Sequence, residues 1–117
     1  MGGLIGSPTL GAYGITKAAD MQLVRNLALE WGPKNVRVNC IAPGLVKTNF
    51  ARVLWEDEAL TKQALKGYPM GRLGDPEDLA GIAVYLASRA GNWTTGQVFA
   101  IDGGTTITTG DMSQNEG

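Results

Sequence analysis

The sequence contains no histidine and one cysteine, Cys40. Without histidine the chain cannot form a Ser-His or Cys-His catalytic pair, and one cysteine with no histidine argues against a zinc site. An internal disulfide is excluded, which fits a reducing compartment. The neighbouring residues, Val-Arg-Val-Asn before Cys40 and Ile-Ala after it, favour a small buried side chain over a reactive thiol. We therefore expect no bound metal and no cysteine chemistry.

Long apolar runs and an excess of one charge are also missing. No stretch reaches the ~20 apolar residues that span a bilayer, and no basic segment precedes an apolar one at the start. Ten basic and eleven acidic residues give a net charge of −1, so there is no electrostatic reason to bind nucleic acid or a membrane. The sequence predicts a cytoplasmic protein whose partner is a small molecule or another protein.

The hydrophobic pattern predicts an α/β fold. Apolar residues at the helical period end at Gly32-Pro33, and two short apolar segments have the character of buried strands. Asp75 is expected to be the N-cap of a later helix, with Pro76 at its first position. The expected helices cover about residues 12–31, 49–66 and 76–87, and the expected strands cover residues 35–42 and 97–102.

This order predicts two parallel strands joined by a right-handed helical crossover. Two parallel strands are normally flanked by neighbours and covered on both faces. The expected fold is therefore the back portion of a larger, Rossmann-like doubly wound parallel sheet, formed by residues 1–107. Residues 108–117 are expected to be a polar tail that frays.

Tyr13 and Lys17 are four residues apart at the start of the first expected helix, a spacing that places both side chains on one face. An ammonium beside a phenol favours the phenolate and brings a group that titrates near ~10 toward neutral pH, so the pair could act as an acid-base dyad. The alternative from the pair alone is an ordinary amphipathic contact with the lysine reaching for water.

Pro43-Gly44 follows the first expected strand, at the carboxyl end, where open α/β sheets bind their ligands. Thr48 comes shortly after this turn. Taken alone, the same residues are also typical of the end of a strand followed by the N-cap of a helix. Thr48 could be both a ligand contact and an N-cap.

Four groups of residues share the order and spacing of one known family. They are Tyr13 with Lys17, residues 36–39 leading into 42–48, residues 72–79, and residues 95–97 leading to 101–104. Together they resemble the short-chain dehydrogenase/reductase family over about residues 1–107. The resemblance implies the C-terminal portion of an NAD- or NADP-dependent oxidoreductase that interconverts an alcohol and a ketone or aldehyde by hydride transfer.

The same resemblance assigns residue roles. Tyr13 would be the general acid/base, and Lys17 would lower the pKa of that tyrosine and bind the nicotinamide ribose. The backbone at Val46 would meet the carboxamide, and Thr48 the pyrophosphate or nicotinamide side. The expected cofactor contacts are Tyr13, Lys17, Pro43, Gly44, Val46 and Thr48.

The stretch after Thr48 matches the variable substrate lid of the family. Its larger side chains are candidates for the substrate pocket, with plain packing as the alternative: Phe50, Leu54, Trp55 and Tyr68. Asp75, Asp102, Gly103 and Gly104 are expected to be structural, the last three at the end of a strand that the family uses in oligomer contacts. The implied state is a homo-oligomer, a dimer or tetramer.

Four parts of the family pattern are absent from this sequence: the serine, the Gly-rich phosphate loop, the acidic or basic residue that distinguishes NAD from NADP, and the helix asparagine of the proton relay. Counting back from Tyr13 at the family spacing places the carbonyl-polarising serine before Met1, and no Gly-rich phosphate loop is present. We expect a truncated chain that is inactive alone, and the alternative is a non-catalytic oligomerisation or binding remnant. The substrate class, whether alcohol, sugar, steroid or acyl-carrier ketone, and the choice between NAD and NADP stay open.

Overall fold

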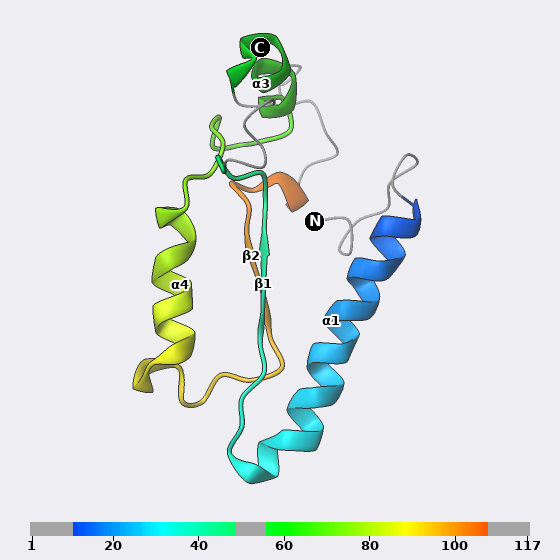
Figure 1. Cartoon of the computed structure of the whole chain (residues 1–117), viewed down its shortest axis with the longest axis vertical. Helices are drawn as coiled ribbons and strands as arrows, with labels where there is room; N and C mark the ends of the chain where they lie inside the picture. Colours follow the sequence, from blue (N-terminus) through cyan, green and yellow to red (C-terminus); the bar gives the residue numbers. More distant parts are fainter. Residues whose placement is uncertain (1–10, 49–55, 108–117) are drawn as a thin grey trace.

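The computed structural model describes residues 11–48 and 56–107, with side chains from Lys17 onward in the first range. Figure 1 shows two long helices on opposite sides of a pair of strands, which confirms the expected α/β arrangement. The main elements are α1 (Gly11–Trp31), β1 (Cys40–Pro43), α3 (Glu58–Leu65), α4 (Glu77–Ala87) and β2 (Val98–Ile101), and the short 3-10 helices are η1 (Gly32–Lys34), η2 (Arg89–Gly91) and η3 (Thr105–Ile107).

The two strands pair in parallel, as expected, with Cys40 opposite Val98 and Pro43 opposite Ile101. The amide of Cys40 donates to the carbonyl of Gln97 at 2.9 Å, so alternate residues of β1 bond to β2. The intervening residue Ile41 directs its backbone groups toward the other edge of β1. Within the described residues the sheet has these two strands only.

Both strands are shorter than expected because the residues before them bond partly through side chains. The amide of Val38 donates to Thr95 Oγ1 at 3.0 Å, and Asn39 Nδ2 donates to the carbonyl of Thr94 at 2.9 Å. The amide of Gln97 donates back to Asn39 Oδ1 at 3.1 Å. Residues 36–39 thus lie beside residues 94–97 without forming a regular ladder.

Arg37 joins this segment to the end of α4. Its Nη2 donates to the carbonyl of Leu86 at 2.6 Å, and its Nη1 donates to the carbonyl of Thr94 at 3.4 Å. The last carbonyls of a helix have no partner inside the helix, so a guanidinium there satisfies a group that burial would otherwise leave unpaired. Arg37 therefore fixes the end of α4 relative to the strand pair.

α3 and α4 begin by different means. Asp57 accepts hydrogen bonds from the amides of Ala59 at 2.9 Å and Leu60 at 3.1 Å, which is a side-chain N-cap for α3. This helix lies within the expected range 49–66, of which residues 49–55 are outside the described residues.

The expectation that Asp75 is the N-cap of α4 is wrong, because the N-cap is Pro76, which makes no side-chain cap bond. The carboxylate of Asp78 instead accepts the amide of Asp75 at 2.7 Å and binds Arg72 with both oxygens, at 2.7 and 3.1 Å. The hydrogen bond from Arg72, followed by that from the Asp75 amide, lowers the pKa of Asp78 from 3.8 to about 2. Asp78, in the first turn of α4, thereby binds a backbone amide that precedes the helix, which is one of the two bonds of a capping box.

The described residues bury little apolar surface. Only four apolar residues among those described are buried: Met21, Ala28, Ala42 and Leu73. By contrast, Leu29 is 79% exposed and Trp93 is 99% exposed. Exposed apolar area of this extent is typical of surfaces that contact other chains or segments. None of the helices in the described ranges has both the length and the apolar character that crossing a membrane requires.

Replacing Gly91 by alanine should destabilise the chain, because the added methyl would lie 2.5 Å from the carbonyl oxygen of Tyr85. We expect a loss of about 1–3 kcal/mol in the free energy of unfolding, measured by urea denaturation. Gly81→Ala is the control, since nothing lies within 4 Å of a methyl built at that exposed position in α4. Gly81→Ala should stabilise the helix by roughly 0.5–1 kcal/mol. Equal losses of unfolding free energy in the two variants would contradict the steric argument.

The Arg72–Asp78 pair gives a second prediction. Because folding depresses the pKa of Asp78, the stability from this pair is fully present above 3.8 and is lost as the pH falls through about 2. A carboxyl titration by NMR should give Asp78 a pKa of about 2, and Arg72→Gln should return it toward 3.8. Arg89→Gln removes an exposed cation elsewhere and should leave the titration unchanged. An unchanged pKa in Arg72→Gln would show that Arg72 is not the cause.

Candidate active site

The start of α1 holds the two residues expected to form the dyad. Tyr13 and Lys17 both lie within α1, so their spacing of four residues places them on one helical face. Lys17 is half-buried, and the side chain of Tyr13 is outside the described residues. Figure 1 shows that this end of α1 lies at the same end of the molecule as the carboxyl ends of β1 and β2.

The turn after β1 comes very close to the end of β2. The amide of Gly44 donates to the carbonyl of Ile101 at 3.0 Å, which extends the ladder by one bond. A methyl group built on Gly44 would lie 2.9 Å from the Cα of Asp102. The turn therefore needs glycine at this position because any side chain would collide with backbone.

Beyond the turn, residues 45–47 lie parallel to Gly74. The amide of Gly74 donates to the carbonyl of Leu45 at 2.9 Å, and the amide of Lys47 donates to the carbonyl of Gly74 at 2.8 Å. Val46 is opposite Gly74 in this isolated bridge, so its own N–H and C=O face the other way. Among the described residues, neither of these two groups has a hydrogen-bond partner.

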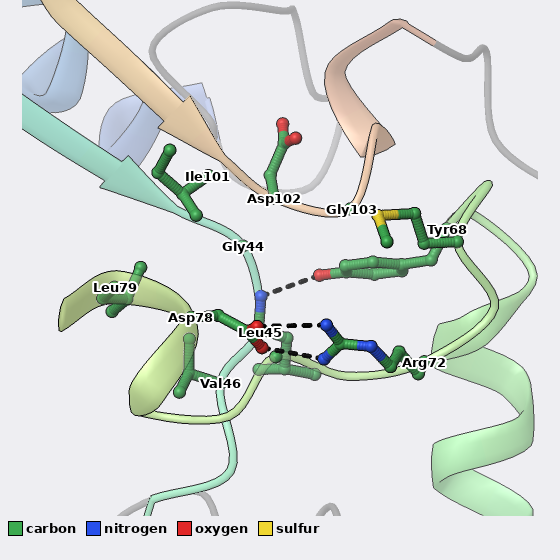
Figure 2. A pocket seen from close by; sticks show the side chains of 12 residues that line it. Gly44, Leu45, Val46, Tyr68, Arg72, Asp78, Leu79, Ile101, Asp102 and Gly103 are labelled. Atoms are coloured by element: carbon green, nitrogen blue, oxygen red, sulfur yellow. Dashed lines mark hydrogen bonds and ion pairs between the residues drawn. The ribbon is translucent and has the colours of Figure 1, made fainter. Parts of the chain in front are cut away.

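The carbonyl of Leu45 is bound by Gly74, and its amide is bound by a side chain. Its amide donates to the hydroxyl oxygen of Tyr68 at 2.8 Å. Figure 2 shows the ring of Tyr68 lying between the turn and Gly103, beside a cavity of about 100 Å³. The cavity is lined by the turn, by the segment from Tyr68 to Gly74, by the start of α4 and by the end of β2.

Asp102 organises the loop after β2. It is buried, with a relative exposure of 9%, and its carboxylate accepts Thr106 Oγ1 at 2.7 Å and the amides of Gly104 at 2.9 Å and Thr106 at 3.3 Å. Burial raises the pKa of this carboxyl, but the three hydrogen bonds outweigh burial and leave the pKa below its ordinary value. These contacts agree with the structural role expected for Asp102.

The other predicted site residues are distributed unevenly. Pro43 and Thr48 are exposed at the two ends of the turn segment, and Thr48 has an interaction of its own. Phe50, Leu54 and Trp55 lie outside the described residues. Sequence reasoning missed the role of Gly74 and the contact between Tyr68 and Leu45, because no local pattern links positions so far apart in the chain.

The chain is similar to known proteins in sequence and in fold. Residues 1–106 match the family model described as enoyl-(acyl carrier protein) reductase. Dehydrogenase/reductase SDR family member 4 of Sus scrofa is 47% identical over 98 residues, which are 84% of this chain and 35% of that protein. The chain thus spans about 35% of the length of this curated relative.

Two solved structures have the same fold as the described chain. 4-hydroxyisoleucine dehydrogenase, complexed with NADH, has a TM-score of 0.85 at 32% identity and covers 92% of this chain and 44% of its own. RhlG of Pseudomonas aeruginosa, in a complex with NADP, has a TM-score of 0.83 at 39% identity and covers 90% of this chain and 43% of its own. On the match to nearly its whole length and on these relatives, the chain belongs to the short-chain dehydrogenase/reductase family.

Proposed function

We propose that this chain is the part of an NAD(P)-dependent oxidoreductase that provides the acid-base dyad and the nicotinamide-facing turn. The reaction would interconvert an alcohol and a ketone or aldehyde. The observation that supports this most directly is the backbone of Val46, whose N–H and C=O both face away from Gly74 at the carboxyl end of the strands. NAD(P), when bound, would accept or supply the hydride.

The groups at Val46 suit a primary carboxamide. A carboxamide has one carbonyl acceptor and an amino group with two donors, so one residue whose N–H and C=O point to the same side can bind both ends of it. The turn before Val46 is fixed by the close approach of Gly44 to Asp102. Pro43, Gly44 and Thr48 would form the surrounding contacts to the cofactor.

Tyr13 would transfer the proton at the substrate oxygen, and Lys17 would hold the tyrosine near its phenolate form. An ammonium stabilises a nearby phenolate, and its three donors also suit the two hydroxyls of a ribose. Both residues come from the end of α1 that lies level with the carboxyl ends of the strands. The spacing of Tyr13 and Lys17, which resembles that of the family, supports these roles.

The substrate would lie against the segment that follows Thr48. Phe50, Leu54, Trp55 and Tyr68 are the proposed contacts, of which Tyr68 lines the cavity beside the turn. The hydroxyl oxygen of Tyr68 accepts the amide of Leu45, so its hydrogen can still be donated to an oxygen of a small-molecule substrate.

We also propose that residues 1–107 are a C-terminal portion of the complete enzyme and are inactive alone. The serine and the phosphate-binding loop of the family are not in this sequence, and the chain spans 35% of its relative from Sus scrofa. The second candidate function is a non-catalytic binding or oligomerisation module. The exposed side chains of Leu29, Val84 and Trp93 favour that candidate, because apolar surface of this kind suits contacts between subunits.

In an enzyme that contains these residues, Tyr13→Phe should lower turnover by about 10²–10⁴-fold, the range for loss of a general acid or base. Cofactor affinity should change little. Lys17→Ala should lower both turnover and cofactor affinity, because Lys17 is assigned to tyrosine and ribose. Single-turnover kinetics and cofactor titration measure the two effects separately.

Tyr85→Phe is the matched control, since the hydroxyl of Tyr85 lies 2.7 Å from Thr94 Oγ1, away from the turn. It should leave both quantities unchanged. Equal losses of cofactor affinity in Tyr13→Phe and Lys17→Ala would show that the roles of the two residues are wrongly divided.

The chain alone should associate into dimers or larger species and should bind NADH and NADPH weakly. Its exposed apolar side chains favour association, and the turn by itself offers few contacts to a dinucleotide. Light scattering and a titration with each cofactor test both points. A monodisperse monomer with micromolar affinity for either cofactor would instead make this segment a self-sufficient domain.

A further inference from the structure

Tyr68 contacts the backbone of the turn after β1 through its hydroxyl. Three backbone groups of residues 45–47 are bound on the side away from the N–H and C=O of Val46. Two of them, the carbonyl of Leu45 and the amide of Lys47, are bound by the backbone of Gly74. The third, the amide of Leu45, is bound by the hydroxyl oxygen of Tyr68 at 2.8 Å.

We propose that Tyr68 is a positioning residue for the nicotinamide end of the cofactor, acting through Leu45 on the N–H and C=O of the neighbouring residue Val46. This inference rests on the proposed function, because it takes the N–H and C=O of Val46 as the groups that bind the carboxamide. Tyr68 itself need not touch the cofactor. Its hydroxyl sets the direction in which the backbone at Val46 presents its donor and acceptor.

The geometry explains why one hydroxyl can have this effect. Successive residues of an extended segment direct their backbone groups to opposite sides, so fixing the groups of Leu45 and Lys47 also fixes those of Val46. The two bonds to Gly74 are independent of side-chain identity. Among the described residues, the bond from Leu45 to Tyr68 is therefore the contact to this backbone that a side-chain substitution can remove.

Tyr68 is itself held in place, as a positioning group must be. A methyl group built on Gly103, whose φ is +62°, would lie 3.2 Å from Cδ1 of Tyr68, so the ring packs directly on the backbone of that glycine. The amide of Met70 donates to the carbonyl of Gly103 at 3.2 Å. A methyl on Gly104 would lie 3.0 Å from Cγ of Pro69. The residues after β2 thus form a surface that fixes the ring, and the ring fixes the turn.

The first experiment measures the hydrogen bond without any activity. In Tyr68→Phe the ring stays and the hydroxyl is lost, so amide exchange at Leu45, followed by NMR on the chain, should become about fivefold faster or more, as expected for one lost hydrogen bond. Tyr85→Phe removes the other described tyrosine hydroxyl that forms a side-chain bond, to Thr94, and should leave exchange at Leu45 unchanged. Unchanged exchange in Tyr68→Phe would overturn the proposal.

The second experiment separates positioning from general stability. In an enzyme that contains these residues, Tyr68→Phe should weaken binding of NAD(P)H about fivefold, measured by isothermal titration, while binding of ADP-ribose stays the same. ADP-ribose lacks the nicotinamide and so cannot report on Val46. A variant that is merely less stable would lose affinity for both ligands by the same factor, and this result would overturn the positioning role.

The two experiments also distinguish this inference from the function on which it rests. If exchange at Leu45 rises in Tyr68→Phe but the unmodified enzyme binds neither NADH nor NADPH, the proposed function fails and the positioning role fails with it. If the enzyme binds NAD(P)H and Tyr68→Phe binds it equally well, the proposed function stands and the role of Tyr68 is overturned.

Discussion

The close approach of Gly44 to Asp102 is the constraint on which the rest of the site depends. A methyl at Gly44 would lie 2.9 Å from the Cα of Asp102, so the chain leaving β1 passes against the chain leaving β2 with no side chain between them. This contact lets the amide of Gly44 reach the carbonyl of Ile101 at 3.0 Å. It also brings the loop organised by the carboxylate of Asp102 next to the turn. The carboxyl ends of the two strands are consequently one structural unit.

Most of the fold followed from local patterns in the sequence. The apolar period and the Gly32-Pro33 stop gave the limits of α1 almost residue by residue. The strands were located correctly but predicted too long, because Thr95 and Asn39 satisfy backbone groups that a regular ladder would otherwise bond. Asp75 had the residue type and position of an N-cap. The contact at this turn is instead made by the carboxylate of Asp78, which binds Arg72 and accepts the amide of Asp75, and that arrangement depends on two side chains at once.

Only the site residues that are related by a short, regular spacing in the sequence could be predicted. Tyr13 and Lys17 are related by one helical turn, and Gly44 is marked by the residue pair Pro43-Gly44, so both could be proposed from sequence. The contact between Leu45 and Tyr68 spans 23 positions, and the bridge between Val46 and Gly74 is longer still. No period of a helix or a strand connects such positions. Only the folded chain shows that Tyr68 and Gly74 bind the backbone on either side of Val46.

The backbone on either side of Val46 is held by two kinds of hydrogen bond, which differ in how they depend on sequence. Bonds between backbone groups, such as those from Gly74, keep the general course of residues 45–47 for almost any sequence that folds this way. The bond from Leu45 to Tyr68 instead depends on one side chain, which belongs to the segment proposed to face the substrate. A displacement of Tyr68 would therefore act on Val46 even if no ligand touched the turn. In the proposed site this one hydrogen bond joins the substrate side to the cofactor side, and the ring that accepts it packs on the backbone of Gly103.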